Sequence, residues 1–354
     1  MDVTTKIALI KKQPTEEVLV EQELKELLET NDHPRHYIGY EVSGFLHIGS
    51  LILSGYKIND FIKAGVKCQV YFAHFHSLIN NKLGGKWENL VEASKYYDEA
   101  FRLFCPGLKT VHATDLYHNN DEFWMNVIKF SKNVNMNRAT RCLPIMGRTE
   151  KDKLDVASFL YPPMQAVDIR TIGADIAHAG MDQRSAHVLA REIYPKMGWK
   201  KPIAVHHHLA PGLGEPEVGG RSKEEKVVAS KMSKSKPWTC IFIHDSEDEI
   251  RKKIAKAWCP EKTVENNPIL DYAKHFVFRE KGTLFVERPA KFGGNAEYHS
   301  FEELEKAYSL GQLHPADLKN AVSEELNQII KPLREHFEKH SEFLEVYKSL
   351  EITR

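Results

Sequence analysis

Residues 36–65 read HYIGYEVSGFLHIGSLILSGYKINDFIKAG, and this stretch decides the fold. The run 36–42 is short and largely apolar, as a buried strand would be, and it leads into the turn formed by Ser43 and Gly44. From Leu46 onward, apolar residues recur at helical spacing until Gly65, where we expect a helix to end. The stretch therefore predicts a β-turn-α unit.

The same alternation continues along the chain. Further strands are expected at 67–75, 109–113 and 203–208, with an apolar stretch at 173–180, and helices are expected near 88–104, across 120–138 and from Gln183. Strands separated by helices predict an α/β fold in which a doubly wound, Rossmann-like parallel sheet is covered by helices on both faces. Ligands of such sheets lie at the carboxyl ends of the strands, and the first such end here is the turn at 43–49.

The two ends of the chain follow other patterns. Residues 15–30 (TEEVLVEQELKELLET) predict an amphipathic helix, so 1–30 is expected to be a helical arm before the Rossmann-like domain at 31–244. After about residue 245 the segments are helical by period and rich in charge, with Asp245 or Ser246 and Ser300 as N-caps. A carboxyl-terminal helical domain at 245–354 is predicted.

Composition bounds the function without deciding it. The 354 residues are 42% hydrophobic and 28% charged, typical of a globular protein, and no stretch predicts a membrane span or a secretory signal, so we expect a cytoplasmic protein. The 49 basic residues balance 49 acidic ones, so any RNA-binding surface must be a local patch. Five scattered cysteines without a CxxC pair argue against a zinc knuckle or a disulfide framework.

The first chemical motif is His47-Ile48-Gly49-Ser50, at the point where the first strand passes into the first long helix. A glycine there allows backbone to approach a nucleotide closely, and the amino terminus of a helix favours anionic phosphate. His47 can donate a hydrogen bond to a phosphate oxygen. A purely structural turn is the alternative for so short a motif.

The second motif is Lys231-Met232-Ser233-Lys234-Ser235, in the polar, glycine-rich stretch 212–237. Lysines on a loop suit the neutralisation of charge that builds on a leaving pyrophosphate, because cations aimed at transition-state charge lower a barrier most. A solvated basic loop is the alternative. The five-residue string is nevertheless rare.

Together the two motifs resemble the paired HIGH and KMSKS signatures of class I aminoacyl-tRNA synthetases. The resemblance implies ATP as a substrate, bound with Mg²⁺, and catalytic roles for His47, Lys231 and Lys234. The residues implied in ATP binding are His47, Gly49, Ser50, Lys231, Met232, Ser233, Lys234 and Ser235. Ser50 departs from the family, which usually has a second histidine there, and this puts the rate of adenylation in doubt.

A third pattern concerns the choice of amino acid. Tyr161, Gln165 and Asp168 stand at i, i+4 and i+7 after Pro162 and Pro163, so one helix places all three on a single stripe. Such a stripe is often solvent-facing. Because the stretch from Ala157 to Ile169 contains no Lys or Glu, we expect this stripe to face a cavity instead.

This stretch, with AGMDQR (179–184) and HYIGYEVSG (36–44), is similar to the tyrosyl-tRNA synthetases of archaea and eukaryotes. The resemblance implies L-tyrosine, ATP and tRNA(Tyr) as partners. Asp168 and Tyr37 would hold the substrate phenol, and Tyr161, Gln165 and Gln183 its ammonium group. Two alternatives stay open, a tryptophan enzyme of the same architecture and a catalytically silent RNA-binding relative.

The resemblance extends to contacts with tRNA. KFGG (291–294) and LHPADLKNAV (313–322) resemble the anticodon-reading part of the family. The residues implied in tRNA binding are Arg141 and Arg184 at the acceptor end, and Phe292, His314 and Asp317 at the anticodon. Taken alone, each is equally explained by packing, capping or an internal ion pair.

A homodimer is expected through a segment inserted near 110–150, which also serves acceptor-stem contact in the family. Its apolar residues exceed what one helix face needs: Phe123, Trp124, Val127, Ile128 and Phe130. We predict no structural metal. The run His206-His207-His208 suggests one, but successive strand residues point to opposite faces and cannot converge on one ion. His74 is a second departure, since relatives usually carry aspartate there.

Overall fold

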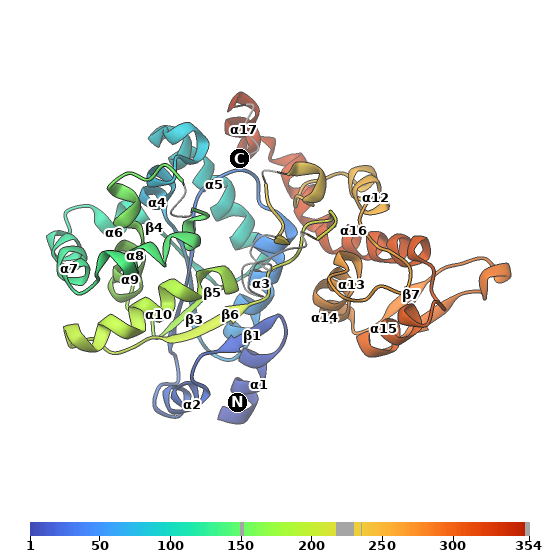
Figure 1. The fold of residues 1–354 in the computed structure, drawn as a ribbon, viewed down its shortest axis with the longest axis horizontal. Helices are drawn as coiled ribbons and strands as arrows, with labels where there is room; N and C mark the ends of the chain where they lie inside the picture. The colour runs from blue at the N-terminus through green and yellow to red at the C-terminus, as the bar shows by residue number, and fades with distance from the viewer. Residues whose placement is uncertain (149–151, 217–229, 235, 351–354) are drawn as a thin grey trace.

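The computed structural model describes residues 1–354 apart from 149–151, 217–229, 235 and 351–354. Its larger unit is built on a six-stranded sheet with the strand order β1-β6-β5-β2-β3-β4 (Figure 1). The strands are β1 (Thr15–Val18), β2 (Arg35–Tyr40), β3 (Lys67–Phe72), β4 (Lys109–His112), β5 (Ile176–Gly180) and β6 (Ile203–His207). All neighbouring pairs are parallel except β1 and β6, so the predicted parallel sheet is confirmed.

Helices cover both faces of this sheet. One face packs against α1 (Val3–Lys11), α3 (Ile48–Lys63) and α5 (Trp87–Phe104), and the other against α7 (Asp121–Lys132), α9 (Tyr161–Thr171) and α10 (Arg184–Ile193). The remaining helices of this unit are α2 (Glu21–Thr30), α4 (His74–Ile79), α6 (Ala113–Tyr117) and α8 (Met136–Thr140). Alternate residues of each strand therefore enter different cores, as the doubly wound arrangement requires.

The β-turn-α unit predicted from residues 36–65 is confirmed. Strand β2 ends at Tyr40, and α3 begins at Ile48 with His47 as its N-cap. The helix stops before Gly65, whose φ of +84° lies in the left-handed region that glycine adopts at little cost. The unit therefore carries the His47 turn to the carboxyl edge of the sheet.

The chain reverses its winding direction at β2. It proceeds from β2 through β3 to β4 on one side, and returns through β5 and β6 on the other. The connections that leave β2 and β5 consequently diverge, and in open α/β sheets this is where ligands bind. The segments at this point are the turn 43–47 and the short turn Met181–Gln183.

The helical arm predicted at 1–30 contains the helices α1 and α2, but the prediction that residues 15–18 belong to a helix was wrong. Residues 15–18 form β1, which pairs antiparallel with β6, and the helix begins only at Glu21. The free edge of β6 offers backbone donors and acceptors that need partners, and this tertiary demand overrides the local helical pattern.

The second unit is mostly helical, as predicted, and also contains a two-stranded sheet that the sequence did not suggest. Its elements are α12 (Glu247–Ala255), α13 (Pro268–Tyr272), α14 (Arg279–Lys281), α15 (Phe301–Ser309), α16 (Pro315–Lys339), α17 (Glu345–Leu350), β7 (Leu284–Val286) and β8 (Ala296–Tyr298). Ser246 and Ser300 cap α12 and α15, as predicted, whereas Asp245 accepts from Lys253 and the backbone of Phe242.

The two units are not cleanly separated at residue 245. Helix α17, near the end of the described chain, returns to the larger unit and lies near α5 (Figure 1). Tyr347 is buried, with its ring 4.4 Å from that of Phe45 and 5.5 Å from that of Tyr96. Within the described ranges, every helix is too short or too polar to cross a membrane.

Candidate active site

The turn that carries His47 is held by a reciprocal capping box. The Nδ1 atom of His47 accepts from the backbone N–H of Ser50 at 3.2 Å, and Ser50 Oγ accepts from the backbone N–H of His47 at 3.0 Å. The Ser50 hydroxyl in turn donates to the carbonyl oxygen of His47. Ser50 therefore uses its donor and its acceptor at the start of α3, where it acts as a cap.

His47 is a neutral donor in this setting. Burial lowers the pKa of His47 well below its usual range, and the charges of Lys234 and Lys231 lower it further. Because Nδ1 accepts a hydrogen bond, the single ring proton lies on Nε2. That N–H is available to a phosphate oxygen without any change of charge.

Lys234, in the described part of the loop that carries the second motif, contacts the same turn. Lys234 Nζ donates to the carbonyl oxygen of Gly44 at 2.7 Å, to Ser43 Oγ at 3.0 Å and to the Tyr97 hydroxyl at 2.6 Å. Its ammonium thus occupies the position where strand β2 gives way to the turn. Tyr97 comes from α5 and was not suggested by the sequence.

Lys231 reaches the opposite side of the crevice, where it forms an ion pair with Asp182 at 2.5 Å. Burial by itself would raise the pKa of Asp182, but the Lys231 ammonium keeps it below its usual value.

The backbone N–H of Met232 donates to the carbonyl oxygen of Ala210, and a Cβ on Gly49 would lie only 3.2 Å from the Cβ of Ala210. The two motifs, some 180 residues apart, therefore meet across Ala210. Ser235 lies outside the described residues, and Ser233, like Lys231, lines a cavity of about 540 Å³ that also borders His208 and Asp271.

A buried carboxylate lies deeper, on α9. Oδ1 of Asp168 accepts from the Tyr117 hydroxyl at 2.7 Å and from the Tyr71 hydroxyl at 3.2 Å. Oδ2 has no hydrogen-bond partner among the described residues, and His76 Nε2 lies 3.8 Å away. Burial raises the pKa of Asp168, and the two tyrosine hydroxyls oppose that rise. Asp168 therefore presents one buried acceptor atom that has no donor among the described residues.

The expected partnership of Tyr37 with Asp168 is indirect. The ring of Tyr37 is buried 5.9 Å from that of Tyr71, on the same face of adjacent strands, and no hydrogen bond between Tyr37 and Asp168 occurs in the described structure. The direct partners, Tyr71 and Tyr117, were missed. The alternation of side chains along a strand is the signal that points to Tyr71. Tyr37 and Gly39 lie on one face of β2, and Gly39 pairs with Tyr71 on the parallel strand β3, so Tyr37 and Tyr71 share a face.

The predicted polar stripe on α9 faces inward, as expected. Tyr161 and Asp168 are buried, and the Tyr161 hydroxyl donates to Glu41 Oε1 at 2.8 Å. Gln165 donates to Gln183 Oε1 at 3.2 Å, while the buried Gln165 Oε1 has no partner among the described residues. Tyr161 and Gln165 lie one turn apart on α9, so the Glu41 carboxylate and this Gln165 Oε1 are acceptors that suit an ammonium group. Glu41 was also missed.

The residues implied in acceptor-end binding lie apart from one another. Arg141 is exposed just after α8. Arg184 begins α10, and its Nε contacts both carboxylate oxygens of Glu17 in β1, at 2.9 and 3.1 Å. The internal ion pair considered from the sequence is therefore present at Arg184. His74 is buried and stacked on His112, with ring centroids 5.6 Å apart, and nothing in the structure gives this departure a role.

The residues expected to contact the anticodon lie in the second unit. His314 is the N-cap of α16, where its Nδ1 accepts from the backbone of Ala316, and Asp317 lies in the first turn of the same helix. Phe292 falls in the connection between β7 and β8, and its side chain lies outside the described part of the structure. Capping thus accounts for His314.

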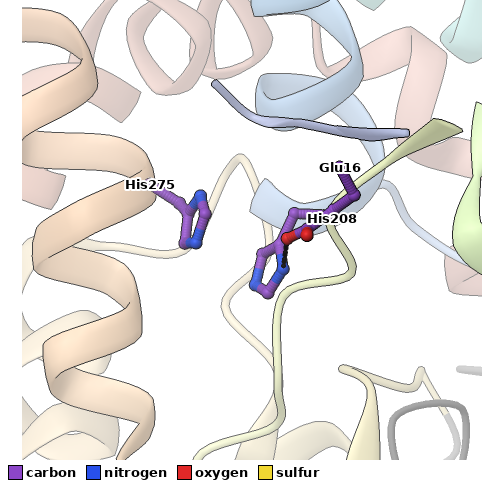
Figure 2. Close-up of side chains that lie close together, drawn as sticks. All are labelled: Glu16, His208 and His275. Atoms are coloured by element: carbon purple, nitrogen blue, oxygen red, sulfur yellow. Dashed lines mark hydrogen bonds and ion pairs between the residues drawn. The ribbon is translucent and has the colours of Figure 1, made fainter. Parts of the chain in front are cut away.

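The three consecutive histidines diverge, as strand alternation predicts. His206 bonds with His187 and Glu17, His207 with His178, and His208 with Glu16 and Asp271. Figure 2 shows His208 beside Glu16, with His275 facing it from the second unit.

Glu16, His208 and His275 bring ligand atoms within 4.8 Å of one another, but not in the arrangement that a metal ion requires. The two rings are stacked, with centroids 3.9 Å apart and planes 10° apart. Since nitrogen lone pairs lie in the ring plane, parallel rings do not aim them at one point. The two carboxylates beside His208 raise its pKa to about 9, so it is an imidazolium between two anions.

Comparison with known proteins agrees with this fold. Residues 29–331 match the model of the family described as tRNA synthetases class I (W and Y), so the chain belongs to the class I aminoacyl-tRNA synthetases of the tryptophan and tyrosine type. Over its full length it is 46% identical to the tyrosine–tRNA ligase of Pyrococcus abyssi, across the full length of that protein. Within the class, it therefore belongs to the tyrosyl-tRNA synthetases.

Solved structures agree. The crystal structure of tyrosyl-tRNA synthetase from Pyrococcus horikoshii in complex with L-tyrosine matches with a TM-score of 0.92 and 44% identity, covering 99% of this chain and all of that one. The tryptophanyl-tRNA synthetase of Aeropyrum pernix K1 matches with a TM-score of 0.67 at 16% identity, covering 93% and 84%. That second likeness shows the shared fold alone.

Proposed function

We propose that this enzyme activates L-tyrosine with ATP and transfers the tyrosyl group to the 3′-terminal adenosine of tRNA(Tyr). One observation carries the choice of substrate: among the described residues, the buried Oδ2 atom of Asp168 has no hydrogen-bond donor as its partner. A phenol supplies that donor. Phenylalanine would leave the acceptor unpaired, which costs far more than the loss of a methylene contact.

The remainder of the amino acid binds towards the crevice. The tyrosine ammonium is proposed to lie among the oxygens of Tyr161, Gln165 and Gln183, beside the carboxylate of Glu41. Tyr37 closes the aromatic slot from β2. This orientation directs the substrate carboxylate towards the turn that carries His47.

ATP is proposed to bind across that turn. Because Gly49 has no side chain, the protein backbone there approaches the nucleotide closely. The Nε2–H of His47 donates to a phosphate oxygen. Mg²⁺ arrives with the nucleotide and neutralises phosphate charge. The tyrosine carboxylate attacks the α-phosphate, pyrophosphate leaves, and no covalent enzyme intermediate is formed.

The two lysines must exchange partners during this step. At rest, Lys234 is bound to Gly44 and Tyr97, and Lys231 to Asp182. We propose that both ammonium groups move to the departing pyrophosphate, where preorganised positive charge lowers the barrier. Their protein partners therefore hold the loop close to the reacting phosphates before ATP binds. Ser50 supports the turn, and Met232, Ser233 and Ser235 complete the loop.

Transfer to tRNA uses the outer surfaces. Arg141 and Arg184 are proposed to contact the acceptor end, and Phe292, His314 and Asp317 the anticodon. For Arg184 this requires partial release from Glu17. The enzyme is proposed to act as a homodimer.

Pyrophosphate exchange measured with tyrosine, tryptophan and phenylalanine tests the proposal. We expect exchange with tyrosine alone, and a loss of more than 100-fold in kcat for Lys231→Met and for Lys234→Met. Lys252→Met, an exposed lysine of α12, is the control and should leave exchange unchanged. Stimulation by tryptophan alone would overturn the substrate, and tRNA binding without any exchange would favour the silent relative.

A further inference from the structure

Three buried histidines form a continuous chain across the sheet. Nε2 of His36 lies 2.9 Å from Nδ1 of His178, and Nε2 of His178 lies 2.8 Å from Nδ1 of His207. They belong to the neighbouring strands β2, β5 and β6, beneath α3 (Figure 1). All three are nearly inaccessible to solvent. The middle histidine of the 206–208 run is therefore the end of a longer array.

All three imidazoles are neutral. Burial lowers the pKa of His36 and of His207 to about 3, and that of His178 well below its usual range. The nearby Lys57 ammonium adds to the effect on His178 and His207. Each ring therefore carries a single proton, which it can donate to only one neighbour.

The direction in which the three imidazoles donate their hydrogen bonds follows from His36, at one end of the array. The buried Nδ1 of His36 has no hydrogen-bond partner among the described residues. A buried N–H without an acceptor is rarer and costlier than an unpaired acceptor, so the proton of His36 lies on Nε2 and is donated to His178. His178 must then donate from Nε2 to His207, which leaves the proton of His207 on its own Nε2.

That last N–H reaches the active site. A Cβ on Gly180 would lie 2.9 Å from Asp182 Oδ1 and 3.6 Å from His207 Nε2, so both atoms border the same small volume at the end of β5. Asp182 is the partner of Lys231. His207 and Asp182 are therefore close enough for the Nε2–H dipole to act on the carboxylate that holds the catalytic loop, although no hydrogen bond joins them in the described structure.

We propose that His207 is a positioning residue for amino-acid activation: the imidazole chain keeps its Nε2–H beside Asp182 and stabilises that carboxylate when Lys231 leaves it. The inference rests on the proposed movement of Lys231 to the pyrophosphate. Lys231 is the ion-pair partner of Asp182 in the described structure, and a buried carboxylate that lost this partner would hold the lysine back. A fixed dipole beside Asp182 lowers the cost of releasing Lys231.

The tautomers can be observed directly. Nitrogen-15 NMR of the chain labelled at histidine distinguishes Nε2–H from Nδ1–H rings, and His36→Phe, His178→Phe and His207→Phe assign the three signals. We expect Nε2–H at all three positions. An Nδ1–H tautomer at His207 would overturn the inference, whatever the activity of the protein.

Exchange kinetics test the role. His207→Phe should lower kcat for tyrosine-dependent exchange about tenfold and leave KM for tyrosine within twofold, while His207→Gln, which keeps a donor, should recover part of the rate. His187→Phe is the matched control, because His187 is equally buried and bonds with His206 on the other face of β6. We expect it to retain the wild-type kcat. Equal kcat losses in His207→Phe and His187→Phe would mean a packing role alone.

A double-mutant cycle separates this role from the proposed function. In a Lys231→Met background, His207→Phe should have no further effect, because no lysine is left to release. Additive losses would overturn the inference. If the wild-type chain gave no exchange with tyrosine, the proposed function would fail, and the tautomers would still be readable by NMR.

Discussion

In the proposed function, Asp168 carries more of the substrate choice than any other residue, and its pKa depends on two tyrosines from other elements. Tyr71 lies on β3 and Tyr117 on α6, and both donate to Oδ1. Burial raises the pKa of Asp168, and these two hydrogen bonds oppose that rise, while Oδ2 has no hydrogen-bond partner among the described residues. We therefore expect the discrimination between tyrosine and phenylalanine to depend on three protein side chains together.

Removal of one donor should weaken tyrosine binding. We expect Tyr117→Phe to raise KM for tyrosine about tenfold with a small change in kcat, because loss of a hydrogen bond to a charged group costs about 1.5 kcal/mol. Tyr194→Phe is the control, since that buried hydroxyl donates to the carbonyl of Ala166 on the same helix. Steady-state exchange kinetics measure both. Equal effects in the two variants would contradict the assignment.

Ser50 offers a second test at the same scale. Its hydroxyl is used within the capping box of α3, so Ser50→Ala should lower the free energy of unfolding by about 1 kcal/mol and leave kcat for exchange within threefold. Ser246→Ala, at the capping box of α12, gives the reference loss. Chemical denaturation measures the stability. A 100-fold fall in exchange at unchanged stability would instead place this hydroxyl on the nucleotide.

At the scale of elements, the two units are joined where β1, β6 and α13 meet. His208 follows β6 and bonds with Glu16 of β1 at 2.9 Å and with Asp271 of α13 at 2.8 Å, while neutral His275 stacks on its ring. The predicted helical arm was wrong at this place. As a strand, residues 15–18 bring Glu16 to the junction, which a helix would not.

This junction should make stability depend on pH. The folded-state pKa of His208 is about 9, above the value of about 6.5 in the unfolded chain, so its contribution is complete below pH 6.5 and lost as pH rises through 9. We expect a loss of about 2 kcal/mol between pH 7 and pH 10, given that Glu16 is partly solvated.

Urea unfolding at a series of pH values measures this loss. His208→Gln should remove most of the alkaline dependence, whereas His118→Gln, at an exposed histidine, should retain it. An unchanged alkaline slope in His208→Gln would show that the junction does not titrate.

At the scale of the whole molecule, the face of α7 is the best candidate for a dimer contact. Of the apolar residues expected there, Phe123, Val127 and Phe130 are buried within the chain, so they do not contribute to such a contact. Trp124 and Ile128 remain exposed, at 39% and 57%, and are joined by Met125 and Met136. An exposed apolar group of this kind favours association.

We therefore expect light scattering to return about twice 40.6 kDa, and Ile128→Asp combined with Met125→Asp to return a monomer. The two aspartates are chosen because a charge buried without a partner in an interface is costly. Leu310→Asp, at an exposed leucine of the second unit, should remain dimeric. A wild-type particle of 40.6 kDa would contradict the proposed dimer.

Sequence reasoning was most accurate where the signal is local. The β-turn-α unit at 36–65 follows from apolar spacing and a glycine stop, and the stripe Tyr161, Gln165 and Asp168 follows from helical spacing after two prolines. It was least accurate where a partner lies far along the chain. Residues 15–18 have a helical pattern, yet they pair with a strand almost 190 residues away.

The sequence by itself determined the parallel sheet, the two nucleotide motifs and the helix that presents Asp168, because spacing along the backbone decides which side chains share a face. Only the tertiary structure decided the partners: two tyrosines for Asp168, Asp182 for Lys231, and the route of the imidazole chain from His36 to His207. Those contacts join residues on separate elements. Their geometry depends on strand register and helix packing, which no local pattern records.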